Sequence, residues 1–134
     1  MQKIGFNDNW QFHKQGYTNT QTVILPHDAM IHEAREPDGT GGSGHGYFPG
    51  GIYVYEKTFT APAEWAEGTI SLLFEGVYKN STVTVNGKTA GGQPYGYTPF
   101  TVCLAMSVMD AVISSIALAC SVDPCANASL ALAT

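Results

Sequence analysis

Two stretches of the sequence alternate apolar and polar residues with the period of a β-strand, and they constrain the fold more than any other feature. They are residues 52–59 (IYVYEKTF) and 81–85 (STVTV), the second followed at once by Asn86-Gly87. Successive side chains of a strand point to opposite faces, so this alternation indicates strands that bury one face. The Asn-Gly pair favours a tight hairpin turn, because both central residues of that turn need positive φ.

Further β-type stretches lie at residues 10–12, 21–25 and 69–74, with turn residues between them. Short strands at this spacing are typical of an all-β sandwich or jelly roll. With 134 residues the chain has the length of one domain and can bury a core. We assign five large apolar side chains of these stretches to that core: Trp10, Phe12, Phe59, Leu73 and Phe74.

A long segment, residues 27–51, separates the predicted strand at residues 21–25 from the one at residues 52–59 and contains seven glycines. Glycine at this density favours a structured loop over a helix. Loops of this length in compact domains are usually functional or disordered. The segment begins with His27-Asp28, and we expect these residues to form a local hydrogen bond that shapes the loop, as Asp side chains commonly do with backbone amides.

The composition changes after Phe100, where the chain loses all Lys, Arg, Gly and aromatic residues and becomes rich in alanine. Three interpretations of this tail stay open. It can form a helix from Asp110 to Asp123-Pro124, or a buried strand over residues 116–122. It can also result from a change of reading frame or a truncation near Cys103, since surface segments normally carry charges. The three cysteines all lie in this tail, without a zinc-site spacing, and are expected to be small apolar or incidental thiols.

The charge distribution excludes several classes of partner. The formal net charge is −5 and the six basic residues form no stripe, which argues against nucleic acid. No apolar run approaches the roughly 18 residues that a membrane span needs, and the first residues do not have the apolar stretch of a signal peptide. We therefore expect no nucleic-acid or membrane partner and a cytoplasmic location.

Six motifs follow one another with compatible gaps between residues 6 and 100. They are FNDNWQF (6–12), LPHDAM (25–30), GYFPGG leading into YEKTF (46–59), FEGVYKN (74–80), VTVNG (83–87) and YGYTPF (95–100). In this order they resemble the N-terminal sugar-binding domain of glycoside hydrolase family 2, of the β-galactosidase-like type. The resemblance implies a jelly-roll β-sandwich like that of galactose-binding domains for residues 1–102. Proteins of this type continue with an Asp-containing strand end and further strands, whereas residues 103–134 are the low-charge tail. We therefore expect a sandwich that is incomplete at its C-terminus.

The same resemblance places the catalytic machinery outside this chain. Retaining glycosidases hydrolyse O-glycosidic bonds with two carboxylates about 5–5.5 Å apart, and in this family these lie in a downstream TIM barrel of roughly 250 residues. We assign no catalytic residue, no cofactor and no metal site, and expect the chain alone to be inactive. The carboxylates of the body are expected to be solvated: Glu33, Glu36, Asp38, Glu56 and Glu75. Three histidines, His27, His32 and His45, do not have metal-ligand spacing.

Candidate sugar contacts lie in the glycine-rich loop and near Phe100. In the family, loops of this domain reach the mouth of the active site of the barrel. Tyrosine offers a sugar both an aromatic face and a polar edge. The substrate-binding candidates are therefore His45, Tyr47, Tyr95 and Tyr97. The alternative is that these aromatic side chains pack the sandwich or its interface with the barrel.

The sequence thus predicts a non-catalytic sugar-binding module of a β-galactosidase-like family-2 hydrolase. Its expected partners are a galactoside-like carbohydrate and the TIM barrel and other domains of the intact enzyme. Two alternatives remain: a free-standing carbohydrate-binding module, and an interaction fragment that complements a barrel-containing partner.

Overall fold

The computed structural model describes residues 3–39, 41–62, 65, 70–104, 114–121 and 130–133. Ten strands and two short 3-10 helices form within these ranges. The strands are β1 (Lys3–Gly5), β2 (Trp10–Lys14), β3 (Gln21–Val23), β4 (Ile52–Phe59), β5 (Ile70–Phe74), β6 (Ser81–Val85), β7 (Lys88–Gln93), β8 (Phe100–Leu104), β9 (Ser114–Ser121) and β10 (Leu130–Ala133). The helices are η1 (Met30–His32) and η2 (Gly42–His45). None of the helices described is long and apolar enough to cross a membrane.

The strands form two antiparallel sheets. The smaller sheet has the order β1-β10-β5-β8 and the larger has the order β3-β2-β4-β9-β6-β7. This arrangement confirms the all-β sandwich predicted from the sequence. The two strands with the clearest alternation, β4 and β6, have the predicted bounds, and the turn after β6 has the expected positive φ at Asn86 (49°) and Gly87 (76°).

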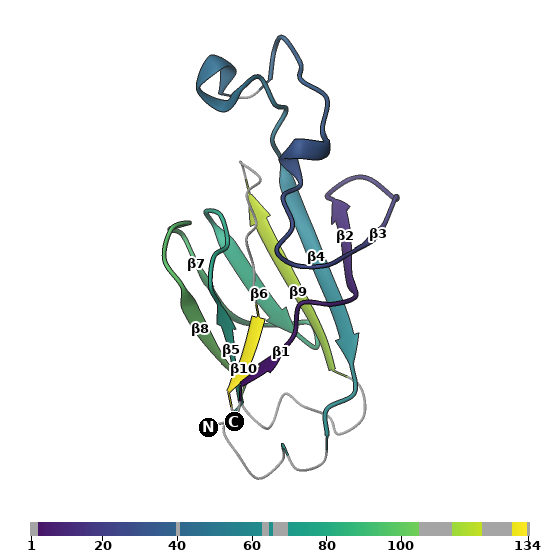
Figure 1. Cartoon of the computed structure of the whole chain (residues 1–134), viewed down its shortest axis with the longest axis vertical. Helices are drawn as coiled ribbons and strands as arrows, with labels where there is room; N and C mark the ends of the chain where they lie inside the picture. Colours follow the sequence, from purple (N-terminus) through teal and green to yellow (C-terminus); the bar gives the residue numbers. More distant parts are fainter. Residues whose placement is uncertain are drawn as a thin grey trace.

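The tail contributes strands to both sheets. Strand β9 lies between β4 and β6, with Tyr55 and Val83 as partners of Leu118 on either side (Figure 1). Strand β10 lies between β1 and β5. The helix interpretation is wrong for residues 114–121, where Ile116, Leu118 and Cys120 alternate into the core as the strand interpretation predicted. Its start at Asp110 and its stop at Asp123-Pro124 lie outside the described residues.

The boundary between the sandwich domain (residues 1–102) and the low-charge tail (residues 103–134) stays a prediction. Within the fold, β8 continues from Phe100 to Leu104 across that position, and the described strands after it, β9 and β10, belong to the same two sheets. That the sandwich is incomplete at its C-terminus stays a prediction. A change of reading frame near Cys103 also stays a prediction.

The core lies between the sheets, and its buried strand residues come from β2, β4, β5, β6, β8 and β9. Trp10 and Phe74 are fully buried as expected, and Phe12 and Phe59 pack against the core from its margin. The prediction for Leu73 is wrong, because Leu72 and Phe74 take the inward face of β5 and leave Leu73 half-buried on the other face. Burial raises the pKa of the Cys120 thiol to about 12, so Cys120 packs as a small apolar side chain.

Strand β7 contains two consecutive glycines, Gly91 and Gly92, which would ordinarily favour a loop. Both glycines pair with β6, at a register shift between Val83 and Thr84. A Cβ at residue 92 would collide with the backbone carbonyl of Ser81. Glycine inside a strand marks such a close approach of two backbones, so here it belongs to the strand rather than ending it.

The segment from β3 to β4 leaves the sandwich and rises above the strand ends, at the opposite end from β1 (Figure 1). It includes η1 and η2 and is the irregular glycine-rich loop expected from the sequence. This segment borders both cavities described below.

Candidate functional site

A cavity of about 410 Å³ forms where three loops meet, and we call it the loop cavity. The segment between β3 and β4 contributes Met30, His45 and Phe48, the loop after β5 contributes Tyr78, and the loop after β7 contributes Tyr97. Its lining therefore combines aromatic faces with an imidazole and two phenol hydroxyls.

The tyrosines of the loop cavity form a cluster. The ring centroids of Tyr78 and Tyr97 are 5.9 Å apart at 84°, and those of Tyr95 and Tyr97 are 5.5 Å apart at 62°. Such edge-to-face geometry is favourable for aromatic pairs. A side-chain hydrogen bond with Tyr78 is the main cause that raises the pKa of Tyr97 above 10.0. Tyr95 and Tyr97 remain 57% and 72% exposed, which leaves their rings open to a ligand.

The His45 ring lies directly against Gly41, the residue that precedes η2. Gly41 has φ 88°, in the left-handed region that glycine tolerates. A Cβ at residue 41 would collide with the His45 ring. The sequence therefore needs glycine there both for the backbone conformation and for the position of the imidazole.

Tyr47 has an unusual backbone conformation, with φ 62°. A bulky residue at positive φ stores roughly 1–3 kcal/mol of strain. Two backbone hydrogen bonds hold it: Tyr47 N–H donates to the Gly42 carbonyl at 2.9 Å, and Glu36 N–H donates to the Tyr47 carbonyl at 2.8 Å. Strain of this kind is concentrated at functional sites.

The structure brings the four predicted sugar contacts together only in part. His45 and Tyr97 line the loop cavity. Tyr95 reaches it through its contact with Tyr97, and Tyr47 is 45% exposed beside it without lining it. Their roles as sugar contacts stay predictions. Tyr78 was not among the predicted contacts, although it lies in one of the six motifs (residues 74–80), because no local pattern indicates that this loop meets residues 44–48.

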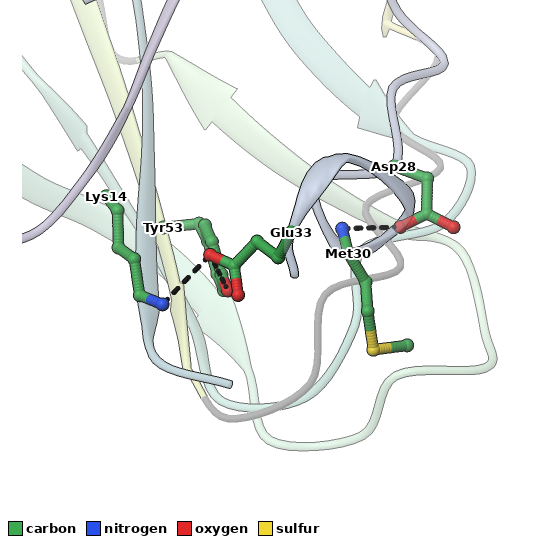
Figure 2. A network of polar contacts seen from close by, with 5 residues as sticks. All are labelled: Lys14, Asp28, Met30, Glu33 and Tyr53. Atoms are coloured by element: carbon green, nitrogen blue, oxygen red, sulfur yellow. Dashed lines mark hydrogen bonds and ion pairs between the residues drawn. The ribbon is translucent and has the colours of Figure 1, made fainter. Parts of the chain in front are cut away.

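A second cavity, also of about 410 Å³, lies between β2, the turn after it, β4 and residues 27–36, and we call it the strand cavity. In its wall Lys14 Nζ and the Tyr53 hydroxyl both donate to Oε1 of Glu33, at 2.9 and 2.8 Å (Figure 2). The expectation that Glu33 is solvated is therefore wrong: its side chain is only 18% exposed and is ion-paired. No local sequence pattern indicates this ion pair, since Lys14 and Tyr53 lie 19 and 20 positions away from Glu33.

The start of the loop is organised as expected around Asp28. Its Oδ1 accepts a hydrogen bond from the backbone amide of Met30 at 2.9 Å (Figure 2). The neighbouring His27 faces the strand cavity, where Nδ1 lies 3.0 Å from the Tyr55 hydroxyl and its ring stacks on His32 at 5.7 Å. Burial lowers the pKa of His27 below 6.5, the His32 imidazole lowers it further, and the Asp28 carboxylate raises it.

The lowered pKa of His27 predicts a loss of stability in mild acid. In the unfolded chain the imidazole binds its proton near pH 6.5, but in the folded chain it does so only at lower pH. The unfolded state thus binds more protons in that window, and the free energy of unfolding falls as the pH drops through 6.5. We expect the melting temperature to fall between pH 7.5 and 5.5, and less steeply in His27→Gln; equal slopes in the two proteins would contradict this.

No family model matches the chain. A β-galactosidase of Bacteroides ovatus, BoGH2A, is 34% identical over 109 residues, which cover 74% of this chain and 13% of that protein. A protein of Formosa agariphila named as a β-glucuronidase is 36% identical over 108 residues, or 73% of this chain and 10% of its own length. The chain therefore spans about a tenth of the length of these relatives.

The solved structures agree with the sequence comparison. The crystal structure of a β-glycosidase from Bacteroides vulgatus matches 99% of this chain with a TM-score of 0.86 and 26% identity, and the match covers 20% of that protein. The strand order of the two sheets and the match to this solved structure together identify the fold. The chain thus belongs to glycoside hydrolase family 2, of which it is a partial, N-terminal-like segment.

Proposed function

We propose that this chain is the non-catalytic sugar-binding module of a β-galactosidase-like hydrolase and that its loop cavity receives a galactoside-like sugar. The observation that carries the proposal is the meeting of His45, Tyr78 and Tyr97 around one cavity of about 410 Å³. This volume lies in the range of roughly 300–1,000 Å³ that is usual for small-molecule sites.

The chemistry of the lining supports a sugar as the ligand. The C–H face of a pyranose packs on aromatic rings, and its hydroxyls need hydrogen-bond partners at the edges. Tyr97 presents an exposed ring, while the hydroxyl of Tyr78 and the imidazole of His45 provide polar edges. The strained backbone of Tyr47 next to this cavity is consistent with a functional loop.

The lining also supports a role without catalysis. Of the described residues that line the loop cavity, none is a carboxylate, whereas glycoside hydrolysis of this type needs two of them. In the intact enzyme we expect the TIM barrel to supply both, with the loop cavity positioning the sugar. The cytoplasmic location belongs to the same proposal; of the described cysteines, Cys103 and Cys120 are free thiols, as in reducing compartments.

Calorimetric titration of the full chain with methyl β-D-galactopyranoside tests the proposal. We expect saturable binding, weakened about fivefold to tenfold by Tyr97→Ala through loss of the stacking face. Gly41→Ala is expected to weaken binding as well, because it displaces the His45 ring. Ile24→Ala is the matched control, since Ile24 is 66% exposed and lines neither cavity.

Two results would contradict the proposal. The first is the absence of binding heat with the wild-type chain. The second is wild-type affinity in both Tyr97→Ala and Gly41→Ala, which would place the sugar elsewhere.

A further inference from the structure

We propose that the strand cavity is a second binding site, for a neutral polyhydroxylated molecule of monosaccharide size. It is distinct from the loop cavity, which the proposed function uses: no described residue lines both, although Met30 of the loop cavity lies between Ala29 and His32 of the strand cavity in the sequence. This inference therefore stands or falls independently of the proposed function.

The strand cavity offers an apolar platform. The rings of Phe12 and Tyr53 stack with centroids 6.0 Å apart and an angle of 8°. Tyr17 is 64% exposed at the cavity and is available for stacking on the face of a ring-shaped ligand. Lys14 Nζ lies 5.4 Å from the centroid of Tyr53 and 6.0 Å from that of Tyr17, so the ammonium and the aromatic faces are adjacent.

The polar side chains in the wall of the strand cavity have unused hydrogen-bonding capacity, both as donors and as acceptors. Glu33 uses Oε1 for Lys14 and Tyr53, while its Oε2 is buried and has no hydrogen-bond partner among the described residues. A buried acceptor without a donor costs free energy. Lys14 has three ammonium protons, and the one side-chain acceptor found for them in the described structure is Glu33 Oε1.

These unused groups select a neutral ligand. A hydroxyl both donates and accepts, so one hydroxyl can donate to the carboxylate of Glu33 and accept from the ammonium of Lys14. An anionic ligand would be repelled by the carboxylates of Glu33 and Glu36, which both line the cavity. Aromatic faces beside paired donors and acceptors match a molecule that carries hydroxyls on an apolar ring.

An NMR titration of the isotope-labelled full chain tests the inference, with methyl β-D-galactoside, methyl β-D-glucoside, methyl β-D-mannoside and D-glucuronate as probes. The imidazole signals of His27 and His32 report on the strand cavity, and that of His45 reports on the loop cavity. We expect at least one neutral glycoside to shift the His27 and His32 signals saturably, and D-glucuronate to bind at least fivefold more weakly.

Two variants locate the ligand. Tyr17→Ala and Glu33→Gln are each expected to weaken the His27 and His32 response at least fivefold, while Ile24→Ala leaves it unchanged. Because Tyr17 is largely exposed, its truncation is not expected to disturb folding and decides the matter if Glu33→Gln unfolds the chain. The inference is overturned if no neutral probe moves the two signals, if Tyr17→Ala keeps wild-type affinity, or if D-glucuronate binds as tightly as the neutral glycosides.

Discussion

Leu118→Ala is expected to lower the free energy of unfolding by about 2–5 kcal/mol, the cost of removing a large aliphatic side chain from a packed core. Leu118 is fully buried, and its strand β9 is hydrogen-bonded to β4 on one side and to β6 on the other. A small domain has only about 5–15 kcal/mol of net stability. This substitution in the tail therefore removes a large share of it.

Urea denaturation followed by tryptophan fluorescence measures this effect, since Trp10 is buried in the same core. Ala119→Ser is the matched control, because Ala119 is the next residue on β9 but points to the half-buried outer face. A loss of less than about 0.5 kcal/mol in Leu118→Ala would be typical of a surface position. Such a result would mean that the tail does not pack between β4 and β6 in solution.

Lys14→Met is expected to lower the free energy of unfolding by about 1–3 kcal/mol, because it leaves a mostly buried carboxylate without its cation. The Lys14 and Glu33 side chains are 22% and 18% exposed, so water compensates only in part. Methionine keeps the apolar stem that lies near Tyr53, and the measured loss therefore reports mainly on the charge.

A double variant separates the ion pair from other effects. In Lys14→Met/Glu33→Gln the uncompensated charge is gone, so the loss should be smaller than in Lys14→Met alone. Lys88→Met is the control for removing a lysine charge at an exposed position. Equal stability of Lys14→Met and Lys88→Met would show that the ion pair with Glu33 contributes nothing measurable.

The candidate sites show how much of a binding site can be predicted from local sequence patterns. His45 and Tyr97 could be selected from the sequence because their residue types suit a sugar and their motifs resemble a known domain. Their meeting with Tyr78 depends on loops that are distant in sequence. Glu33 was assigned to solvent because acidic side chains are rarely buried without a partner, yet the pairing of β2 with β4 brings Lys14 and Tyr53 to it.

By itself the sequence determined the class of fold, the bounds of β4 and β6 and the turn at Asn86-Gly87. These features depend on interactions within a few residues: side-chain alternation along a strand and the φ preference of turn residues. Only the tertiary structure decided that the tail supplies β9 and β10, that Gly91 and Gly92 belong to β7, and that two cavities flank the long loop. The reason is that a strand's own pattern shows which of its faces is buried, whereas its partners are set by pairings between distant parts of the chain.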